Sequence, residues 1–198
     1  MVLDRMTGHG WTYVHGPSLK RAPSDVLLES VLKGALVRLN PEIAAEPERA
    51  DEVIYKLRAV ISGVDGGGLV GANEEFMSWV CGERSMPFGP DGEHVTVKLI
   101  DFEPLELDAN SFIVSSQVTF KGGPEKRFDV VGYVNGIPLV VGEAKSPVRK
   151  AVTWVDGAAQ VHDDYETHVP GFFVPNAFSF ATEGKEYRYG SIRLPVHL

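Results

Sequence analysis

The sequence has one cysteine, Cys81, so it can form no internal disulfide and offers no cysteine cluster to a metal ion. It has no apolar run near the ~18 residues that a membrane-spanning helix needs. The first residues, Met-Val-Leu-Asp-Arg-Met, lack the charged and long apolar segments of a signal peptide. Together these absences predict a cytoplasmic protein with no membrane partner.

Positive charge is scarce as well, because 27 Asp and Glu residues outnumber 19 Lys and Arg residues and give a net charge of −8. This balance argues against a large basic surface for duplex DNA. It does not exclude a small acidic site that holds a phosphate group through a bound metal ion. We therefore expect the chain alone to bind DNA weakly. No G-x-x-x-x-G-K-S/T loop is present, so no ATP site is predicted within this chain.

Apolar periodicity divides the chain into a mainly helical part, 1–90, and a strand-rich part, 91–198. The first part has a predicted strand at 11–14 and predicted helices over 3–10, 24–39, 47–62 and 73–81, with Ser24 or Asp25 capping the second helix. The second part has predicted strands over 95–102, 112–120, 127–134, 137–145, 172–181 and 187–192, and a predicted helix over 151–167. This order predicts an α/β or α+β fold in a single domain, 1–198.

The segment 127–147 is the most informative part of the chain. Its two apolar strands flank Asn135-Gly136, a dipeptide typical of tight hairpin turns. Asp129 lies on the first strand, and Glu143 and Lys145 lie near the end of the second. Two carboxylates and a lysine beside apolar strands suggest a Mg²⁺ site that hydrolyses phosphodiesters. The alternative is a solvated hairpin end with a Glu–Lys pair.

The geometry of the hairpin decides whether the two carboxylates can share a metal. Strand side chains alternate between faces, so a regular two-residue loop at Asn135-Gly136 would place Asp129 and Glu143 on opposite faces. A three-residue loop over 134–136, or a bulge at Gly132 or Gly142, would place them on the same face. The metal-site hypothesis therefore predicts an odd loop or a bulge.

The segment 127–147, with Asn-Gly-Ile-Pro-Leu-Val-Val ahead of Glu143-Ala144-Lys145, resembles the PD-(D/E)XK nuclease core at the N-terminus of type I restriction enzyme R (HsdR) subunits. Segments 26–41, 51–57, 97–102 and 173–190 are also similar to that domain and follow in the expected order. The resemblance implies a restriction-endonuclease-like core, in which helices flank a mixed central sheet, with an N-terminal helical elaboration. It also implies the activity of a type I site-specific deoxyribonuclease.

The same resemblance implies roles for individual residues. Asp129 and Glu143 would ligate Mg²⁺, with the backbone carbonyl of Ala144 as a possible further ligand. Lys145 would orient or activate the attacking water and stabilise developing phosphate charge. Gln160 would belong to a Gln-x-x-x-Tyr motif that contacts DNA from the helix after the hairpin.

Two positions depart from the family pattern. Phe128 replaces the proline before Asp129, which matters little because proline supplies no ligand. Asp164 stands where the motif tyrosine is expected, and Tyr165 follows one residue later. On a regular α-helix, residues four apart share a face but residues five apart do not. Tyr165 can therefore replace the motif tyrosine, and contact DNA with Gln160, only if the helix is bulged or ends early.

Members of this nuclease class often carry a further acidic residue on an earlier helix. Glu29 is the first candidate for such a metal ligand and Glu74 is the second, and each also fits a solvated helix carboxylate. Arg149 and Lys150 lie close in sequence to Lys145 and are the cations best placed to contact DNA phosphates. The alternative for both is a solvated surface charge.

The resemblance implies double-stranded DNA as substrate, and the methylase and specificity subunits of a type I restriction-modification complex as partners. In such a subunit an ATP-driven motor follows the nuclease, so ATP would bind only to the full-length subunit. Two alternatives stay open: a free-standing metal-dependent DNase of another system, and a non-catalytic module that docks the motor onto the methyltransferase.

Overall fold

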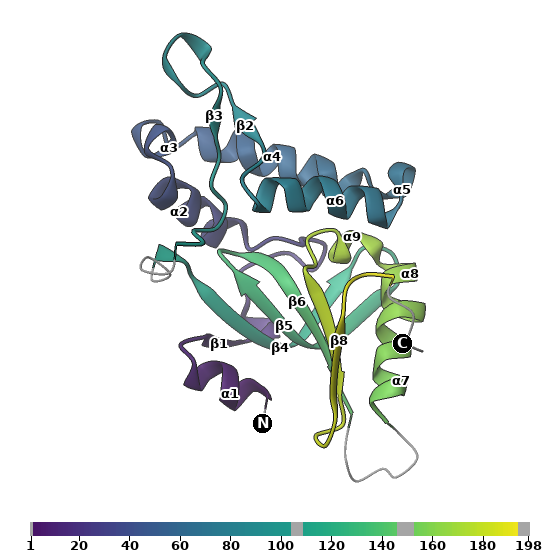
Figure 1. Cartoon of the computed structure of the whole chain (residues 1–198). Helices are drawn as coiled ribbons and strands as arrows, with labels where there is room; N and C mark the ends of the chain where they lie inside the picture. Colours follow the sequence, from purple (N-terminus) through teal and green to yellow (C-terminus); the bar gives the residue numbers. More distant parts are fainter. Residues whose placement is uncertain (1, 104–108, 146–152, 194–198) are drawn as a thin grey trace.

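The computed structural model describes residues 2–103, 109–145 and 153–193. Within these ranges, six strands form one mixed sheet in the order β1-β4-β5-β6-β7-β8 (Figure 1). β1 is parallel to β4 and β6 is parallel to β7, whereas the other neighbours are antiparallel. The strands are β1 (Thr12–His15), β4 (Phe112–Lys121), β5 (Glu125–Val134), β6 (Ile137–Ala144), β7 (Phe178–Thr182) and β8 (Tyr187–Gly190). β2 (Ser85–Met86) and β3 (Val95–Thr96) form a separate ribbon.

Helices lie on both sides of the sheet (Figure 1). One side carries α2 (Glu29–Leu39), α3 (Pro41–Ala45), α4 (Arg49–Ser62), α5 (Val64–Gly67) and α6 (Leu69–Val80), while α1 (Val2–Gly8) lies on the other. A last helical stretch consists of α7 (Trp154–Ala159), a π-helical segment (Gln160–Tyr165), α8 (Glu166–His168) and α9 (Pro170–Phe173). Its first part packs against β6 and β7. The predicted mixed sheet with flanking helices is therefore confirmed.

One large apolar core joins the two parts of the chain. Leu36, Leu57 and Phe76 enter it from α2, α4 and α6, and Phe128 and Phe172 enter it from β5 and α9. A smaller apolar cluster lies on the side of the sheet that carries α1, and residues of α1 pack against it. Its buried members are Val114, Val130, Val140 and Phe180. Among the described residues, no helix combines the length and the apolar character needed to cross a membrane.

The hairpin between β5 and β6 turns through two residues. Val134 pairs with Ile137, and Asn135 and Gly136 between them have φ of 50° and 82°. Positive φ at both central residues defines the type I′ turn that suits the twist of a hairpin. A Cβ on Gly136 would lie 2.6 Å from the carbonyl oxygen of Leu28, so only glycine fits there. The expected three-residue loop is wrong because this dipeptide closes the turn alone.

A bulge follows the turn and restores the parity that a two-residue loop would lose. Tyr133 pairs with Pro138, but Gly132 pairs with Val140, so Leu139 is an extra residue on β6. The predicted alternative of a bulge at Gly132 is therefore confirmed, with the inserted residue on the partner strand. An extra residue in one strand exchanges the faces of all residues beyond it.

Beyond the bulge the register runs regularly to Val130, which pairs with Gly142. The next positions along the two strands are Asp129 and Glu143, directly beyond this last pair. Facing residues on regular antiparallel strands project from the same face. The bulge thus removes the mismatch of parity that a two-residue loop alone would have left between Asp129 and Glu143.

Three of the predicted elements differ from the structure. The helix predicted from residue 24 begins at Glu29, because Leu27 and Leu28 are buried in the core in a non-helical segment. Asp25 closes a local turn instead, where its carboxylate accepts a 2.9 Å hydrogen bond from the Ala22 amide. The strand predicted over 95–102 ends at Thr96. The strand predicted over 172–181 begins at Phe178, because 170–173 form α9.

Candidate active site

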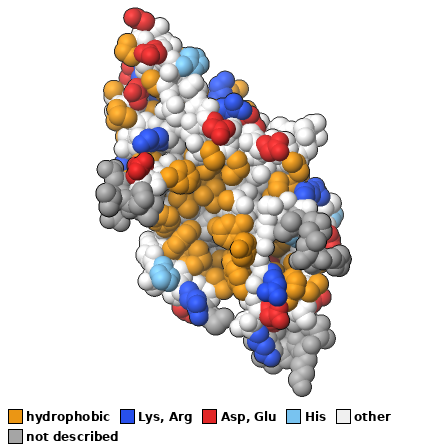
Figure 2. Space-filling view, in the orientation of Figure 1, with side chains coloured by type: hydrophobic (Ala, Val, Ile, Leu, Met, Phe, Trp, Pro, Cys, Tyr) orange, Lys and Arg blue, Asp and Glu red, His pale blue; other side chains and the backbone are white. Residues whose placement is uncertain are grey.

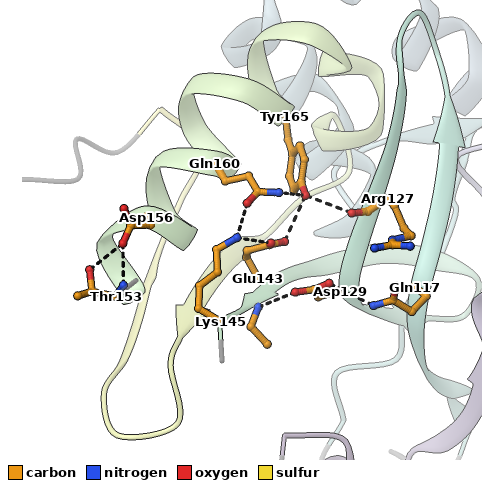
Figure 3. Close-up of polar contacts among 10 residues, drawn as sticks. Gln117, Arg127, Asp129, Glu143, Lys145, Thr153, Asp156, Gln160 and Tyr165 are labelled. Atoms are coloured by element: carbon orange, nitrogen blue, oxygen red, sulfur yellow. Dashed lines mark hydrogen bonds and ion pairs between the residues drawn. The ribbon is translucent and has the colours of Figure 1, made fainter. Parts of the chain in front are cut away.

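Asp129, Glu143 and Lys145 meet where β6 ends beside the middle of β5 and the last helical stretch (Figure 3). Asp129 belongs to β5, Glu143 to β6, and Lys145 follows β6 directly. Lys145 Nζ donates a 2.7 Å hydrogen bond to Glu143 Oε1. The structure therefore brings together the three residues that the sequence assigns to catalysis.

Glu143 is the most buried of the three, with 4% of its surface exposed. Burial raises the pKa of its carboxyl group, the hydrogen bond from Lys145 opposes this shift, and the negative charge of Asp129 adds to it. Its second oxygen, Oε2, lies 3.3 Å from the hydroxyl of Tyr165, which donates to it.

Asp129 has both of its carboxylate oxygens hydrogen-bonded. Oδ2 accepts a 3.1 Å bond from the backbone amide of Ala144, and Oδ1 accepts a 3.2 Å bond from Nε2 of Gln117 on β4 (Figure 3). These bonds tie three neighbouring strands to one carboxylate. The orientation of Asp129 is thus fixed from two directions.

The helix after the hairpin contains the bulge that Tyr165 requires. Residues Gln160–Tyr165 are π-helical, so the backbone closes i to i+5 turns and brings residues five apart close together. Gln160 Nε2 donates to the Tyr165 hydroxyl, and Gln160 Oε1 accepts from Lys145 Nζ. The extra residue in the motif is therefore absorbed by the π-helical segment.

Tyr165 is 3% exposed, and its ring packs edge-on against Phe128 at a centroid distance of 5.0 Å. Its hydroxyl also lies 3.1 Å from the carbonyl oxygen of Arg127. Burial and the nearby negative charge of Glu143 raise the pKa of this hydroxyl, so it remains a neutral donor. In this structure Tyr165 and Gln160 hold Glu143 and Lys145, and their contact with DNA stays a prediction.

Further charged side chains hold the same helix. Lys126 of β5 forms a 2.5 Å ion pair with Asp164. Glu166 is fully buried, contacts His162 at 2.8 Å and accepts a 3.0 Å hydrogen bond from the backbone amide of Arg193. The sequence analysis missed Gln117, which contacts Asp129. Only the fold brings Gln117 to the site, so no local sequence signal could have selected it.

The other predicted residues are not at this site or lie outside the described ranges. Glu29 pairs with Arg58 at 3.3 Å. It follows Leu28, whose amide binds the Gly136 carbonyl at the turn of the hairpin. Asp129 is about 20 Å farther along β5, at roughly 3.3 Å per residue. Glu74 is exposed on α6. Arg149 and Lys150 lie outside the described residues.

Two depressions adjoin the site. One of about 610 Å³ is lined by Asp129, Ala144 and Lys145, and by Gln117 of β4, Thr182 of β7 and Lys185 from the turn between β7 and β8. The other, of about 810 Å³, is an apolar groove lined by residues such as Trp11, Leu139, Phe178 and Tyr187. Figure 2 shows apolar side chains gathered in the middle of this view of the molecule. The smaller depression is lined by Asp129 and Lys145, so it is the candidate for chemistry.

The donor atoms at the smaller depression suit a hard cation. Asp129 and Ala144 line the depression and offer a carboxylate and a backbone carbonyl, and Glu143, the residue before Ala144, offers a second carboxylate beside it. Mg²⁺ commonly binds to one or two carboxylates and completes its shell with water and phosphate oxygens. The described residues contain no group of three or more His, Cys, Asp and Glu that could hold a metal by themselves. The site therefore fits Mg²⁺ and does not fit structural zinc.

Comparison with known proteins is consistent with this geometry. Residues 1–194 match the family described as type I restriction enzyme R protein N terminus (HSDR_N). The chain belongs to this family. It is 30% identical to the type I restriction enzyme HindI endonuclease subunit of Haemophilus influenzae, in an alignment of 204 residues that covers 97% of the chain. It is 25% identical over 206 residues, 96% of the chain, to the putative MjaIXP endonuclease subunit of Methanocaldococcus jannaschii. The chain spans 18% of the length of each of these relatives.

Proposed function

We propose that this HSDR_N chain is the Mg²⁺-dependent endonuclease domain of a type I restriction enzyme R subunit and hydrolyses DNA phosphodiester bonds. The observation that carries the proposal is the bulged hairpin, whose register leads to Asp129 and Glu143 as the next positions beyond its last pair, with Lys145 bonded to Glu143. The names of the relatives, which are endonuclease subunits, support it.

Each residue has a role that follows from its position. Asp129, Glu143 and the Ala144 carbonyl would hold the cation beside the smaller depression, which Asp129 and Ala144 line. When bound, Mg²⁺ lowers the pKa of a bound water and polarises the phosphoryl group. Lys145 is held by Glu143 and Gln160 with its ammonium group toward the site. From there it would orient the attacking water and stabilise the charge that develops on the phosphate oxygens.

Gln160 and Tyr165 keep this arrangement in place. Gln160 bridges Lys145 and the Tyr165 hydroxyl, and Tyr165 reaches Glu143. A residue that holds reacting groups in register contributes through positioning, which is a large part of catalysis at such sites. We also expect Gln160 to contact DNA, since it lies within the network at the site and is partly exposed.

The rest of the activity would depend on parts outside this chain. We propose double-stranded DNA as the substrate, with sequence recognition supplied by the methylase and specificity subunits of a restriction-modification complex. ATP would serve a motor elsewhere in the full-length subunit, and Arg149 and Lys150 would contact DNA phosphates. The net charge of −8 opposes DNA binding by the chain alone, so partners would supply the attraction.

The test is cleavage of supercoiled plasmid by this chain and by the full-length subunit assembled with its partners. We expect nicking or linearisation that requires Mg²⁺, stops with EDTA and is absent in Asp129→Asn, which loses a ligand and rules out a contaminating nuclease. The chain alone should cleave slowly because it binds DNA weakly. If the assembled complex translocates on DNA yet never cuts it at any Mg²⁺ concentration, the domain is a docking module and not a nuclease.

A further inference from the structure

Gln117 has a backbone conformation that glutamine rarely adopts. It lies in the middle of the ten-residue strand β4, yet its φ is 55°, in the left-handed region. Residues with a Cβ avoid this region because the side chain crowds the following carbonyl. Backbone outliers of this kind persist only where the surrounding structure enforces them, and they cluster at functional sites.

At this position the side chains of β4 and β5 exchange the two sides of the sheet on which they lie. Val114 and Val130 belong to the small cluster on one side of the sheet, whereas Val118 and Phe128 belong to the large core on the other. Residues an even number apart on a regular strand should share a face. The regular alternation of side chains between the two faces is therefore interrupted on both β4 and β5. On β4 the interruption falls at Gln117.

The pairing of the strands continues across this break. Ser116 pairs with Val130 and Val118 pairs with Phe128, so the residues between them, Gln117 and Asp129, face each other. The break thus puts an amide side chain beside the first acidic residue of the site. Gln117 Nε2 donates to Asp129 Oδ1 at 3.2 Å, opposite the bond from the Ala144 amide.

A glycine at the end of β1 accommodates the distorted backbone. β1 ends at His15, which pairs with Ser116, and the next residue is Gly16. A Cβ on Gly16 would lie 2.5 Å from the carbonyl oxygen of Gln117 and 2.6 Å from that of Ser116. Side-chain carbons do not approach backbone oxygens so closely, so only glycine lets β1 leave the sheet against this carbonyl.

We propose that Gln117 is a positioning residue that orients the Asp129 carboxylate for the divalent cation, with its backbone held by the break in β4 and by Gly16. This inference rests on the proposed metal-dependent nuclease site. Outer partners of metal-binding carboxylates typically contribute 10- to 100-fold in metal affinity. Gln117 contacts no reacting atom, so its effect would pass through Asp129.

The test is a Mn²⁺ titration of this chain, followed by calorimetry or electron paramagnetic resonance, beside Gln117→Met and Gln117→Gly. Gln117→Met keeps the length of the side chain and removes its amide, while Gln117→Gly removes the amide and relieves the backbone. We expect both variants to bind Mn²⁺ roughly 10- to 100-fold more weakly than the wild type. Excess Mg²⁺ should restore cleavage. Thr119→Val, two residues along β4, is the control and should bind like the wild type.

The outcomes separate this inference from the proposed function. Wild-type affinity in Gln117→Gly, with Mn²⁺ bound by the wild type, would overturn the role of Gln117 and leave the metal site intact. Absence of Mn²⁺ binding by the wild type would overturn the metal site, and the role of Gln117 with it. If Gln117→Met is too unstable to measure, Gln117→Gly decides, because its backbone accepts a positive φ without penalty.

Discussion

Replacing Lys145 with alanine is expected to slow DNA cleavage by at least ~10³-fold while the chain stays folded and still binds Mn²⁺. Its ammonium group is held 2.7 Å from Glu143 Oε1 and also bonds to Gln160, so it is a preorganised cation at the site. Preorganised charges aimed at a developing oxyanion each contribute roughly 10²- to 10³-fold, and positioned proton transfer contributes a similar factor. The measurement is single-turnover cleavage of plasmid at saturating Mg²⁺.

Lys185→Ala is the matched control for this variant. Lys185 lines the same depression from the turn between β7 and β8. We expect less than ~10-fold loss for Lys185→Ala, because a peripheral phosphate contact affects binding more than the chemical step. Lys145→Arg should remain impaired, since a planar guanidinium does not replace a compact ammonium group. Equal rates for Lys145→Ala and the wild type would remove Lys145 from the chemistry.

Replacing Glu143 with glutamine is expected to abolish metal-dependent cleavage and to stabilise the metal-free chain at pH 8. The first effect follows from the lost carboxylate ligand, since metal-ion catalysis contributes several kcal/mol, or roughly a thousandfold or more in rate. The second follows from burial, which raises the pKa of Glu143. An ionised, buried carboxylate costs free energy that a neutral amide of the same shape avoids.

The sign of the pH dependence follows from linkage. A carboxyl group whose pKa is raised in the folded state binds its proton more tightly there, so its stabilising contribution is full below the unfolded pKa. That contribution is lost as the pH rises through the folded pKa. The unfolding temperature of Glu143→Gln should therefore exceed that of the wild type most at pH 8, and the difference should shrink as the pH falls toward the ordinary carboxyl range.

In Mg²⁺ the wild type should have the higher unfolding temperature and Glu143→Gln the lower. A cation that binds only the folded wild type raises its unfolding temperature, whereas Glu143→Gln gains nothing from it. The measurement is thermal unfolding of both proteins in EDTA and in Mg²⁺ across this pH range. The burial argument fails if Glu143→Gln unfolds below the wild type at pH 8 in EDTA. The ligand assignment fails if Mg²⁺ stabilises both proteins equally.

The sequence could select the candidate site residues because the information that marks them is local. Asn135-Gly136 between apolar strands marks the turn, and the parity between Asp129 and Glu143 shows that a regular hairpin would separate them. The bulge at Leu139 satisfies that requirement. The spacing of Gln160 and Tyr165 likewise required a bulged helix, and the π-helical segment provides it. The periodicity of the sequence shows that a strand or helix must be irregular for these residues to share a face. It does not show which kind of irregularity forms.

Long-range packing determined what the sequence could not predict. The helix predicted from Ser24 begins at Glu29, because burial of the preceding leucines outweighs a local capping signal. Phe172 reads as part of a strand, yet it enters the core from α9 and stacks on Phe128 at 4.4 Å. Nothing in the neighbourhood of Gln117 predicts its left-handed backbone, which depends on β1 and β5.

The most direct test of a metal-dependent nuclease site is the position of Mn²⁺ in crystals of this chain, located by anomalous scattering. We expect a strong peak about 2 Å from carboxylate oxygens of both Asp129 and Glu143. The peak should be absent from Asp129→Asn crystals grown under the same conditions. Mn²⁺ bound elsewhere on the chain, with no density between these two carboxylates at millimolar concentration, would contradict the site.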